Sequence, residues 1–190
     1  GTGGAKSDTD TVQIDISNVN DAPVITGGPG ISALTESNIA LLDTGTLTVG
    51  DVDLTDTVTA AVDGVVVTGT GATSVPGTLT NGDLAGFLTV TPTAILDGTE
   101  LSNTLTWNFN SGIEAFNFLA DGETLVLTYT VSATDDDGAI GTETITITIT
   151  GTNDAPIITD GPDVANLPET DATLSAAGTL TVGDVDTTDV

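Results

Sequence analysis

Residues 144–156 read TITITITGTNDAP, an alternating run that ends in a short polar joint. Isoleucine occupies positions 145, 147 and 149 with threonine between them, so one side of an extended segment is apolar and the other is polar. A period of two is the signature of a half-buried β-strand. We therefore expect a strand that leads directly into a connection between two strand-rich regions.

The joint belongs to a repeat with a period of 133 residues. The four residues NDAP at 153–156 match 20–23, and GTLTVGDVD at 45–53 recurs at 178–186 (153 − 20 and 178 − 45 are both 133). Two identical blocks in one register indicate a tandem array. The expected domains are the last strand of a preceding unit in 1–20, one complete unit in 21–153, and the first strands of a following unit in 154–190.

The net charge limits the partners of the chain. There are 28 Asp and Glu residues, one Lys, and no Arg or His, which gives a formal charge of −27. Such a surface repels phosphates, so nucleic acid and anionic lipid are disfavoured as partners. No apolar run approaches the roughly 18 residues of a membrane span, so membrane insertion is not expected. Adaptation to salty surroundings is an alternative cause of part of the acidity.

The missing residue types argue against an enzyme. Without Cys, His or Arg, nucleophilic triads and arginine phosphate clamps are unavailable. The run Asp43-Thr44-Gly45 resembles the catalytic loop of retroviral-type aspartic proteases, which need two such aspartates sharing a proton. The repeat copy of Asp43 is Ala176, and the run occurs once in the sequence. We expect no catalytic residues.

Short alternating segments separated by turn residues predict an all-β fold. Candidate strands lie at 11–17, 23–26, 45–50, 57–62, 64–69, 86–91, 103–109, 123–134 and 144–150. Asp63-Gly64 predicts a hairpin turn, and only residues 113–120 could form a turn or two of helix. Many short strands with turns between them favour an antiparallel Greek-key β-sandwich, cadherin-like or immunoglobulin-like, in a tandem array.

Five of the six aromatic residues lie between positions 107 and 129. We interpret them as core residues. The alternative is a platform on which sugar rings stack, with Trp107 or Phe116 exposed in a groove. That alternative would make the chain an adhesive domain that binds a host or matrix glycan or protein.

Acidic residues are clustered in three places. One cluster is Asp51-x-Asp53-x-x-Asp56, another is the three consecutive aspartates 135–137, and the third comprises the Asn-Asp joints. Ca²⁺ takes six to eight oxygens from carboxylates, amides and backbone carbonyls. Single aspartates before glycine are typical of turns, whereas three adjacent aspartates repel one another unless a counter-ion is present. We therefore expect Ca²⁺ at the clustered acids.

A family resemblance supports this expectation. Residues 134–138 (TDDDG), followed by a strand and then NDAP, resemble the end of a cadherin-type repeat. The stretch 115–160 is more similar to the VCBS repeats of large bacterial surface proteins, and 11–26 repeats part of it. Residues 64–112 carry only generic strand patterning.

The resemblance implies a structural extender module of a large secreted or surface-anchored bacterial adhesin of the RTX type. Such proteins are exported by type I secretion, fold outside the cell with calcium, and support cell adhesion and biofilm formation. The implied calcium ligands at the downstream joint are Asp135, Asp137, Asn153, Asp154, Glu169, Asp184 and Asp186. Those at the upstream joint are Asn20, Asp21, Glu36, Asp51 and Asp53.

The expected partners are the neighbouring repeats of the same chain. Residues 154–190 carry only the first strands of a unit and cannot close a sandwich alone. A second expectation is therefore that another chain completes this segment by strand addition, which would make the protein a subunit of an extracellular filament.

Overall fold

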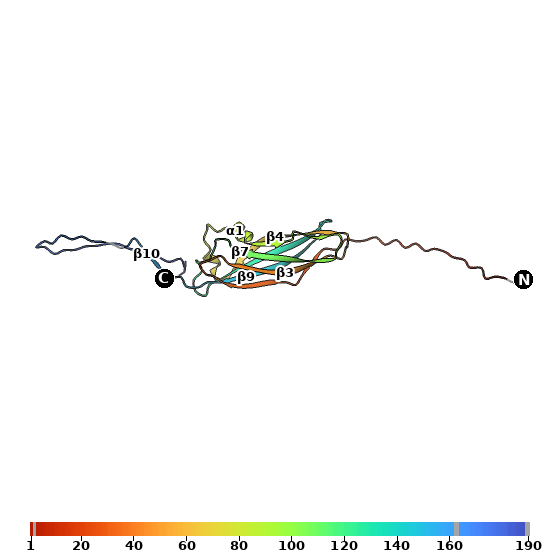
Figure 1. The fold of residues 1–190 in the computed structure, drawn as a ribbon, viewed down its shortest axis with the longest axis horizontal. Helices are drawn as coiled ribbons and strands as arrows, with labels where there is room; N and C mark the ends of the chain where they lie inside the picture. The colour runs from red at the N-terminus through yellow and green to blue at the C-terminus, as the bar shows by residue number, and fades with distance from the viewer. Residues whose placement is uncertain (2, 162–163, 189–190) are drawn as a thin grey trace.

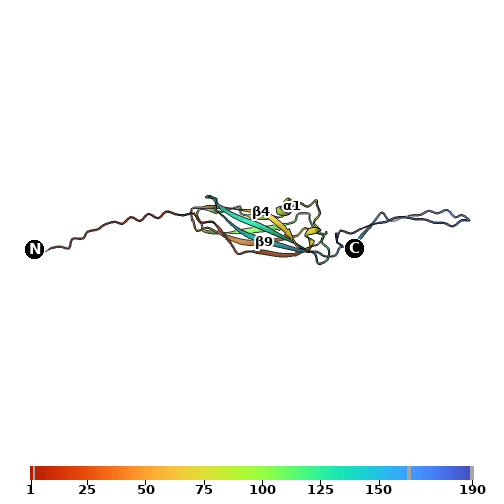
Figure 2. The same ribbon diagram turned by 180° about the vertical axis from the view of Figure 1, so that it is seen from behind.

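The structure is a computed structural model that describes residues 1, 3–161 and 164–188. Its folded body lies between Val24 and Thr150 and consists of two packed β-sheets. The N-terminal segment and a C-terminal hairpin extend from opposite ends of this body (Figure 1), and the reverse view shows the same arrangement (Figure 2). The two candidate joints therefore lie at the two ends of one sandwich.

The sandwich has four strands in one sheet and five in the other. The first sheet has the order β1 (Val24–Thr26), β3 (Leu42–Gly50), β7 (Ser102–Asn110) and β5 (Leu88–Thr91). The second has the order β2 (Gly30–Thr35), β9 (Ile140–Thr150), β8 (Thr124–Asp135), β4 (Thr57–Thr68) and β6 (Ala94–Asp97). Successive strands alternate between the two sheets as far as β8, and among the described strands of the sandwich β8 and β9 are the one consecutive pair that lies side by side in a sheet. The predicted all-β sandwich is confirmed.

One strand pair departs from the expected antiparallel pattern. The strand β2 lies parallel to β9, with Gly30 opposite Ile145 and Thr35 opposite Thr150. Because parallel strands run in the same direction, β2 and β9 finish at the same end of the sandwich. This is the end from which the chain leaves it. This geometry decides where Glu36 lies.

Two local predictions were wrong. Asp63-Gly64 does not form a hairpin, because β4 continues through it with a bulge between Val62 and Gly64 while β8 pairs with both halves. Residues 113–120 form turns, whereas the helices are α1 (Asn81–Gly86) and the 3₁₀-helix η1 (Thr70–Thr73). The helix α1 begins with a capping box in which Thr80 and Asp83 bond each other's backbone amides.

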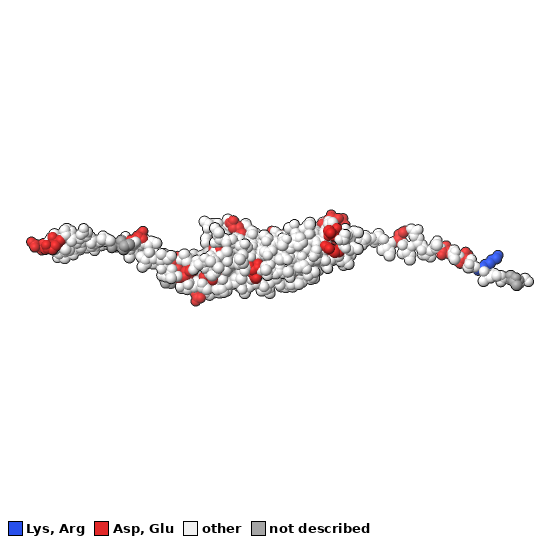
Figure 3. All heavy atoms as spheres, in the orientation of Figure 1, with Lys and Arg blue, Asp and Glu red and all other residues white. Residues whose placement is uncertain are grey.

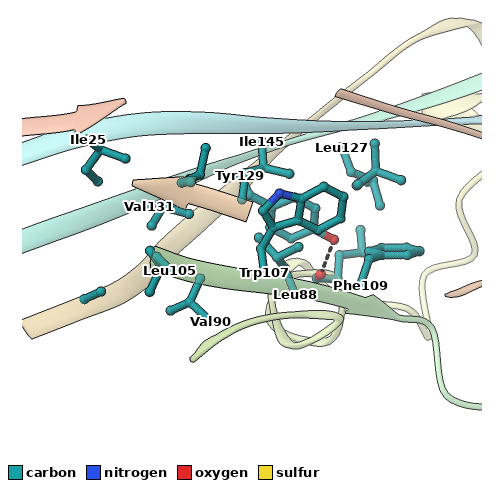
Figure 4. Packing of buried hydrophobic residues seen from close by; sticks show 14 of the residues in the cluster. Ile25, Leu88, Val90, Leu105, Trp107, Phe109, Leu127, Tyr129, Val131 and Ile145 are labelled. Carbon is teal, nitrogen blue, oxygen red and sulfur yellow. Dashed lines mark hydrogen bonds between the residues drawn. The ribbon is translucent and has the colours of Figure 1, made fainter. Parts of the chain in front are cut away.

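The core confirms the interpretation of the aromatic residues. Trp107 is 4% exposed, Phe116 and Tyr129 are fully buried, and Phe109 packs edge-on against Tyr129 with ring centroids 6.4 Å apart (Figure 4). The Tyr129 hydroxyl donates to the Leu84 carbonyl at 2.9 Å, which ties α1 to the core. Burial of the Tyr129 ring raises the pKa of its hydroxyl, so this group stays protonated and can donate.

The N-terminal segment and the C-terminal hairpin have the same sequence patterns as strands of the sandwich, but their apolar side chains are exposed. Val12, Ile14 and Ile16 are 85%, 78% and 90% exposed, and no strand forms there, although their repeat copies in β9 are fully buried. The hairpin of β10 (Ile157–Thr159) and β11 (Thr181–Gly183) has the register of β1 and β3, since Ile158 lies opposite Val182 as Ile25 lies opposite Val49. The predicted strand at 11–17 lacks the neighbours that its copy has.

Candidate metal centres at the two ends of the sandwich

Acidic side chains gather at the end of the sandwich where the chain enters (Figure 3). We call this end the upstream pole and define it by Asn18, Asn20, Asp21, Asp51, Asp53, Asp56 and residues 135–137. It forms because β3 ends at Gly50, β4 begins at Thr57 and β8 ends at Asp135, and Val58 of β4 pairs with Asp135. Three strand ends therefore bring acidic segments that are far apart in sequence to one place.

Hydrogen bonds join the incoming segment to these carboxylates. The Asn18 amide donates to Asp53 Oδ1 at 2.7 Å, and the Asp21 backbone amide donates to Asp53 Oδ2 at 2.8 Å. The Asn20 amide donates to Asp135 Oδ2 at 3.0 Å. The residues before the first strand are thus held against the sandwich by polar contacts.

The pKa shifts at this pole follow the hydrogen bonds. The Asp21 backbone amide, followed by the Asn18 amide, lowers the pKa of Asp53. The Asn20 amide has the largest lowering effect on the pKa of Asp135. The pKa of Asp56 is raised, first by desolvation and then by the charges of Asp136 and other nearby aspartates. Asp56 therefore faces like charges, and its side chain accepts no hydrogen bond from the part of the chain that the structure describes.

Three carboxylates of this pole lie within reach of one ion. Asp51, Asp53 and Asp56 each offer an oxygen, and these oxygens lie within 4.8 Å of one another. Asp51 is 4% exposed, and its Oδ2 accepts no hydrogen bond from the described residues; the same is true of Asp56 Oδ2. Buried carboxylate oxygens without a partner are costly unless a cation is bound.

The opposite end holds a second cluster, the downstream pole, defined by Glu36, Asn153, Asp154, Asp184 and Asp186. Glu36 follows β2 directly, and its amide donates to the Thr150 carbonyl at the end of β9 at 2.9 Å. The Thr152 amide and hydroxyl both donate to Glu36 Oε1. The parallel pairing of β2 with β9 thereby places Glu36 beside the outgoing joint.

The downstream pole has three buried carboxylate oxygens without a hydrogen-bond partner among the described residues. They are Glu36 Oε2, Asp154 Oδ2 and Asp186 Oδ1. Glu36 and Asp186 are 3% and 2% exposed, and the Asp154 amide donates to Asp186 Oδ2 at 2.8 Å. Desolvation raises the pKa of Asp154, and the charges of Glu36, Asp186 and Asp184 add to this increase. Among the described residues, the group of acidic oxygens that all lie within 4.8 Å of one another is Asp51, Asp53 and Asp56, so the downstream carboxylates are more widely spaced than those of the upstream pole.

Further contacts hold the joint in place at this pole. The Thr187 hydroxyl donates to the Phe118 carbonyl at 3.1 Å, which joins the hairpin to a loop of the sandwich. The Gly151 amide donates to the Glu123 carbonyl at 2.8 Å. A Cβ at Gly151 would lie 2.3 Å from the Ala120 carbonyl oxygen, so this close approach requires glycine.

The structure corrects how the predicted ligands were grouped. Asp135 and Asp137 were expected at the downstream joint, but Asp135 bonds Asn20, and Asp137 raises the pKa of Asp56, both at the upstream pole. Glu36 was expected at the upstream joint, but it lies at the downstream one. The reason is strand direction: β8 runs back toward the chain entry, and β2 runs toward the exit.

Most of the remaining predicted ligands lie at the pole where they were expected. Asn20, Asp21, Asp51 and Asp53 share the upstream pole, and Asp154, Asp184 and Asp186 share the downstream pole, as expected. Asn153 is exposed and donates to the Asp154 carbonyl. Glu169 is exposed between β10 and β11, and among the described residues it has no hydrogen bond to the downstream pole. Asp189, the repeat copy of Asp56, lies outside the described residues.

The aromatic sugar platform is not present at the residues expected to form it, because Trp107 and Phe116 are both buried.

Sequence reasoning did not foresee the contacts of Thr152 and Phe118. The repeat gives no signal for Thr152, because the residue 133 positions earlier is Val19. No described helix is long and apolar enough to cross a membrane.

The comparisons with known proteins give only distant similarities. No protein-family model matches the sequence, and no curated protein matches it. The ASH/PapD-like domain 7 of human CEP192 has 9% identity and a TM-score of 0.37 over 77% of this chain and 96% of its own. The CooA pilin subunit of enterotoxigenic Escherichia coli has 13% identity and a TM-score of 0.43 over 69% and 99%.

A third solved structure is AggA, the major subunit of aggregative adherence fimbriae type I of Escherichia coli. It has 13% identity and a TM-score of 0.30 over 74% of this chain and 100% of its own. At such values the similarities carry no functional argument. The function is therefore argued from the two poles.

Proposed function

We propose that this chain is a non-enzymatic structural module of an extracellular or cell-surface rod, in which Ca²⁺ at the joints between repeat units makes the rod stiff. The observation that carries the proposal is the downstream pole. There the carboxylates of Glu36 from the sandwich, Asp154 from the joint and Asp186 from the hairpin each have an unpartnered oxygen.

The residues of the downstream pole fit a hard divalent cation. All their donors are oxygens, and the sequence has no Cys or His that would favour zinc or copper. Bound Ca²⁺ would neutralise the negative charge that three or four carboxylates concentrate there. Glu36 and Asp186 come from opposite sides of the joint, so ligation by both fixes the direction of the outgoing chain.

The same residues explain why metal binding would order the joint. Without a cation, Glu36, Asp154 and Asp186 repel one another, and the joint opens to separate them. A ligand that binds only the ordered state stabilises it by RT ln(1 + [L]/Kd), which is about 2.7 kcal/mol at a hundredfold excess over Kd. This corresponds to a rise in Tm of about 5–10 °C for a chain of this size.

The cellular part of the proposal rests on the resemblance to VCBS repeats. A chain with 28 acidic residues and one lysine would stay loosely folded where calcium is scarce and would order where calcium is abundant. Secretion through a narrow channel followed by folding outside the cell fits this behaviour. A role in adhesion or biofilm formation follows from the same resemblance.

The test compares Glu36→Gln with the matched variant Glu100→Gln. The glutamine oxygen can still accept from Thr152, so the variant removes charge and leaves the hydrogen bonds in place. We expect millimolar Ca²⁺ to raise the Tm of wild type and Glu100→Gln over the value in EGTA, and to slow amide exchange in residues 150–156. Glu36→Gln should show little of either effect. Equal responses of all three proteins would contradict the proposal.

A second candidate function is a filament subunit completed by strand addition. The observation that favours it is that apolar side chains are exposed at both ends of the molecule. At one end these are Val12, Ile14 and Ile16. At the other end they are Ile158 and Val182, which are 62% and 63% exposed. Pairing of one molecule's residues 11–17 with the hairpin of another would cover both sets. Light scattering decides: concentration-dependent oligomers that Ile14→Asp abolishes would support it, and a monomer at all concentrations would refute it.

A further inference from the structure

We infer that residues 111–120 form a docking platform for the following repeat unit, and that this platform selects a unit with a hydroxyl side chain at the position of Thr187. The inference rests on the proposed function in one respect, because it takes residues 154–190 as the first strands of that unit. The contact itself needs no metal ion. A bound ion would stabilise the joint, whereas the platform would decide which kind of unit docks there.

The platform and the following unit meet at the Phe118 carbonyl. The Thr187 hydroxyl donates to this oxygen at 3.1 Å, and the Thr187 backbone amide donates to it at 3.4 Å. A carbonyl oxygen has two lone pairs, so it can accept both donors. The amide bond is longer than the usual range of about 2.7–3.2 Å for N–H···O bonds, so the hydroxyl makes the closer contact. The contact therefore depends on the side chain of residue 187 more than on its backbone.

The platform is held in shape by contacts within the sandwich. Phe116 is fully buried and has a φ of 66°, in the left-handed region that residues other than glycine seldom adopt. Its amide donates to Glu114 Oε1 at 2.8 Å, and its carbonyl accepts from the Leu119 amide at 3.0 Å. Its ring packs edge-on against that of Phe118, with centroids 6.0 Å apart. Because a backbone strained in this way persists only where its surroundings hold it, the Phe118 carbonyl has a fixed direction.

The platform also has an acceptor that is not in use. Asn117, next to Phe118, donates through its side-chain amide to Asn38 Oδ1, which joins the platform to the segment that follows β2. The Asn117 Oδ1 is buried and accepts no hydrogen bond from the described residues. A buried acceptor without a partner is costly, so this oxygen can take a donor from a docked unit. Two acceptors on adjacent residues suit a partner with polar donors better than an apolar one.

The two copies of the repeated sequence first differ at this contact. Residues 178–186 are identical to 45–53, and the next position is Thr187 in one copy and Leu54 in the other. Leucine has no hydroxyl, so at position 187 it would leave the Phe118 carbonyl with only the longer amide bond. Leu54 itself is 50% exposed in the corresponding loop of the sandwich. The platform therefore fits a unit of the threonine type better than another unit of the leucine type.

The experiment is amide hydrogen exchange on the whole chain, in EGTA and in millimolar Ca²⁺. The amide of residue 187 reports on the contact, because it donates to the Phe118 carbonyl, and the amides of β8 are the internal reference. The variant Thr187→Leu takes the residue of the complete unit, and Thr187→Ser keeps the hydroxyl. Thr188→Leu is the matched control, because Thr188 is exposed and its side chain makes no hydrogen bond to the described residues.

We expect the protection factor of the residue 187 amide to fall by about three- to tenfold in Thr187→Leu, the usual effect of losing one hydrogen bond. The fall should occur in both solutions. Thr187→Ser and Thr188→Leu should match wild type. Equal protection in Thr187→Leu and wild type would overturn the platform. A Thr187→Ser variant that behaves as Thr187→Leu would overturn the selection for a hydroxyl.

The same data judge the proposed function separately, through the effect of Ca²⁺ on wild type. If Ca²⁺ changes the protection of none of the four proteins while Thr187→Leu is less protected than the others, the platform stands and the metal-bound joint does not. If Ca²⁺ raises the protection of all four proteins to the same value and Thr187→Leu matches wild type in EGTA, the metal-bound joint stands and the platform is refuted.

Discussion

At the scale of single residues, the close packing of Trp107 depends on a glycine in the neighbouring strand. Gly45 lies opposite Trp107 in the pairing of β3 with β7, and a Cβ at Gly45 would lie 2.5 Å from the indole ring. The ring is 4% exposed and cannot move into solvent without opening the core. Glycine at this position therefore serves packing, and the resemblance of Asp43-Thr44-Gly45 to a protease loop has a structural explanation.

We expect Gly45→Ala to destabilise the sandwich by about 1–3 kcal/mol, the usual cost of overpacking a core. The measurement is the free energy of unfolding in urea, with Ca²⁺ present. Gly77→Ala is the matched control, because a Cβ there meets no atom within 4 Å. Equal stabilities of the two variants would show that Trp107 adjusts without cost.

Also at this scale, the carboxylates could be identified from the sequence but not assigned to their poles. Spacing alone placed Asp51 and Asp53 together, because side chains two positions apart in an extended chain point to the same side. It could not place Glu36, because the parallel pairing of β2 with β9 joins residues 115 positions apart. Spacing also could not reveal that Asp56 lies beside Asp136. The two residues are neighbours because β4 begins where the antiparallel strand β8 ends.

At the scale of elements, the strands with strict alternation were predictable, and the elements fixed by tertiary contacts were not. The segment 144–150 is buried in β9, whereas the same pattern at 11–17 forms no strand without partners. The helix α1 was missed because Asn81-Gly82 is typical of a turn, while the capping signal is the Thr80 that precedes it. Local composition therefore indicated strand potential, and neighbouring strands determined the outcome.

The cap of α1 yields a prediction about pH. The Thr80 hydroxyl, followed by its amide, lowers the pKa of Asp83 by donating hydrogen bonds to the carboxylate. A carboxyl whose pKa is lower in the folded state stabilises it above the ordinary carboxyl pKa of about 4, and this contribution is lost as the pH falls through the folded pKa. The ionised Asp83 therefore favours α1 at neutral pH.

We expect Asp83→Asn to lower the Tm at pH 7, and the difference from wild type to shrink as the pH is lowered toward 3. Thermal melts followed by circular dichroism at a series of pH values measure this difference. The cap should affect the whole sandwich, because the Leu84 carbonyl of α1 accepts from the buried Tyr129 hydroxyl. A difference that is constant over the range would mean that the carboxylate charge contributes nothing to the cap.

At the scale of the whole molecule, repulsion between acidic residues opposes folding when no divalent ion is bound. The chain has a net charge of −27, and several acidic groups gather at one end of the sandwich (Figure 3). Monovalent salt screens such charges, with a Debye length of about 30 Å at 0.01 M and about 3 Å at 1 M. The metal-free protein should therefore gain stability with ionic strength. If Ca²⁺ binds at the poles as proposed, the protein in Ca²⁺ should gain less, because part of its charge is then neutralised.

We expect the Tm in EGTA to rise as NaCl increases from low to molar concentration, and the slope to be smaller in millimolar Ca²⁺. Choline chloride at the same ionic strength should reproduce the effect, because screening does not depend on the identity of the cation. A rise with NaCl alone would instead indicate sodium binding at the poles. A Tm that falls with both salts would mean that attraction, rather than repulsion, dominates the charges of this molecule, and the calcium-stiffened joint would lose its physical basis.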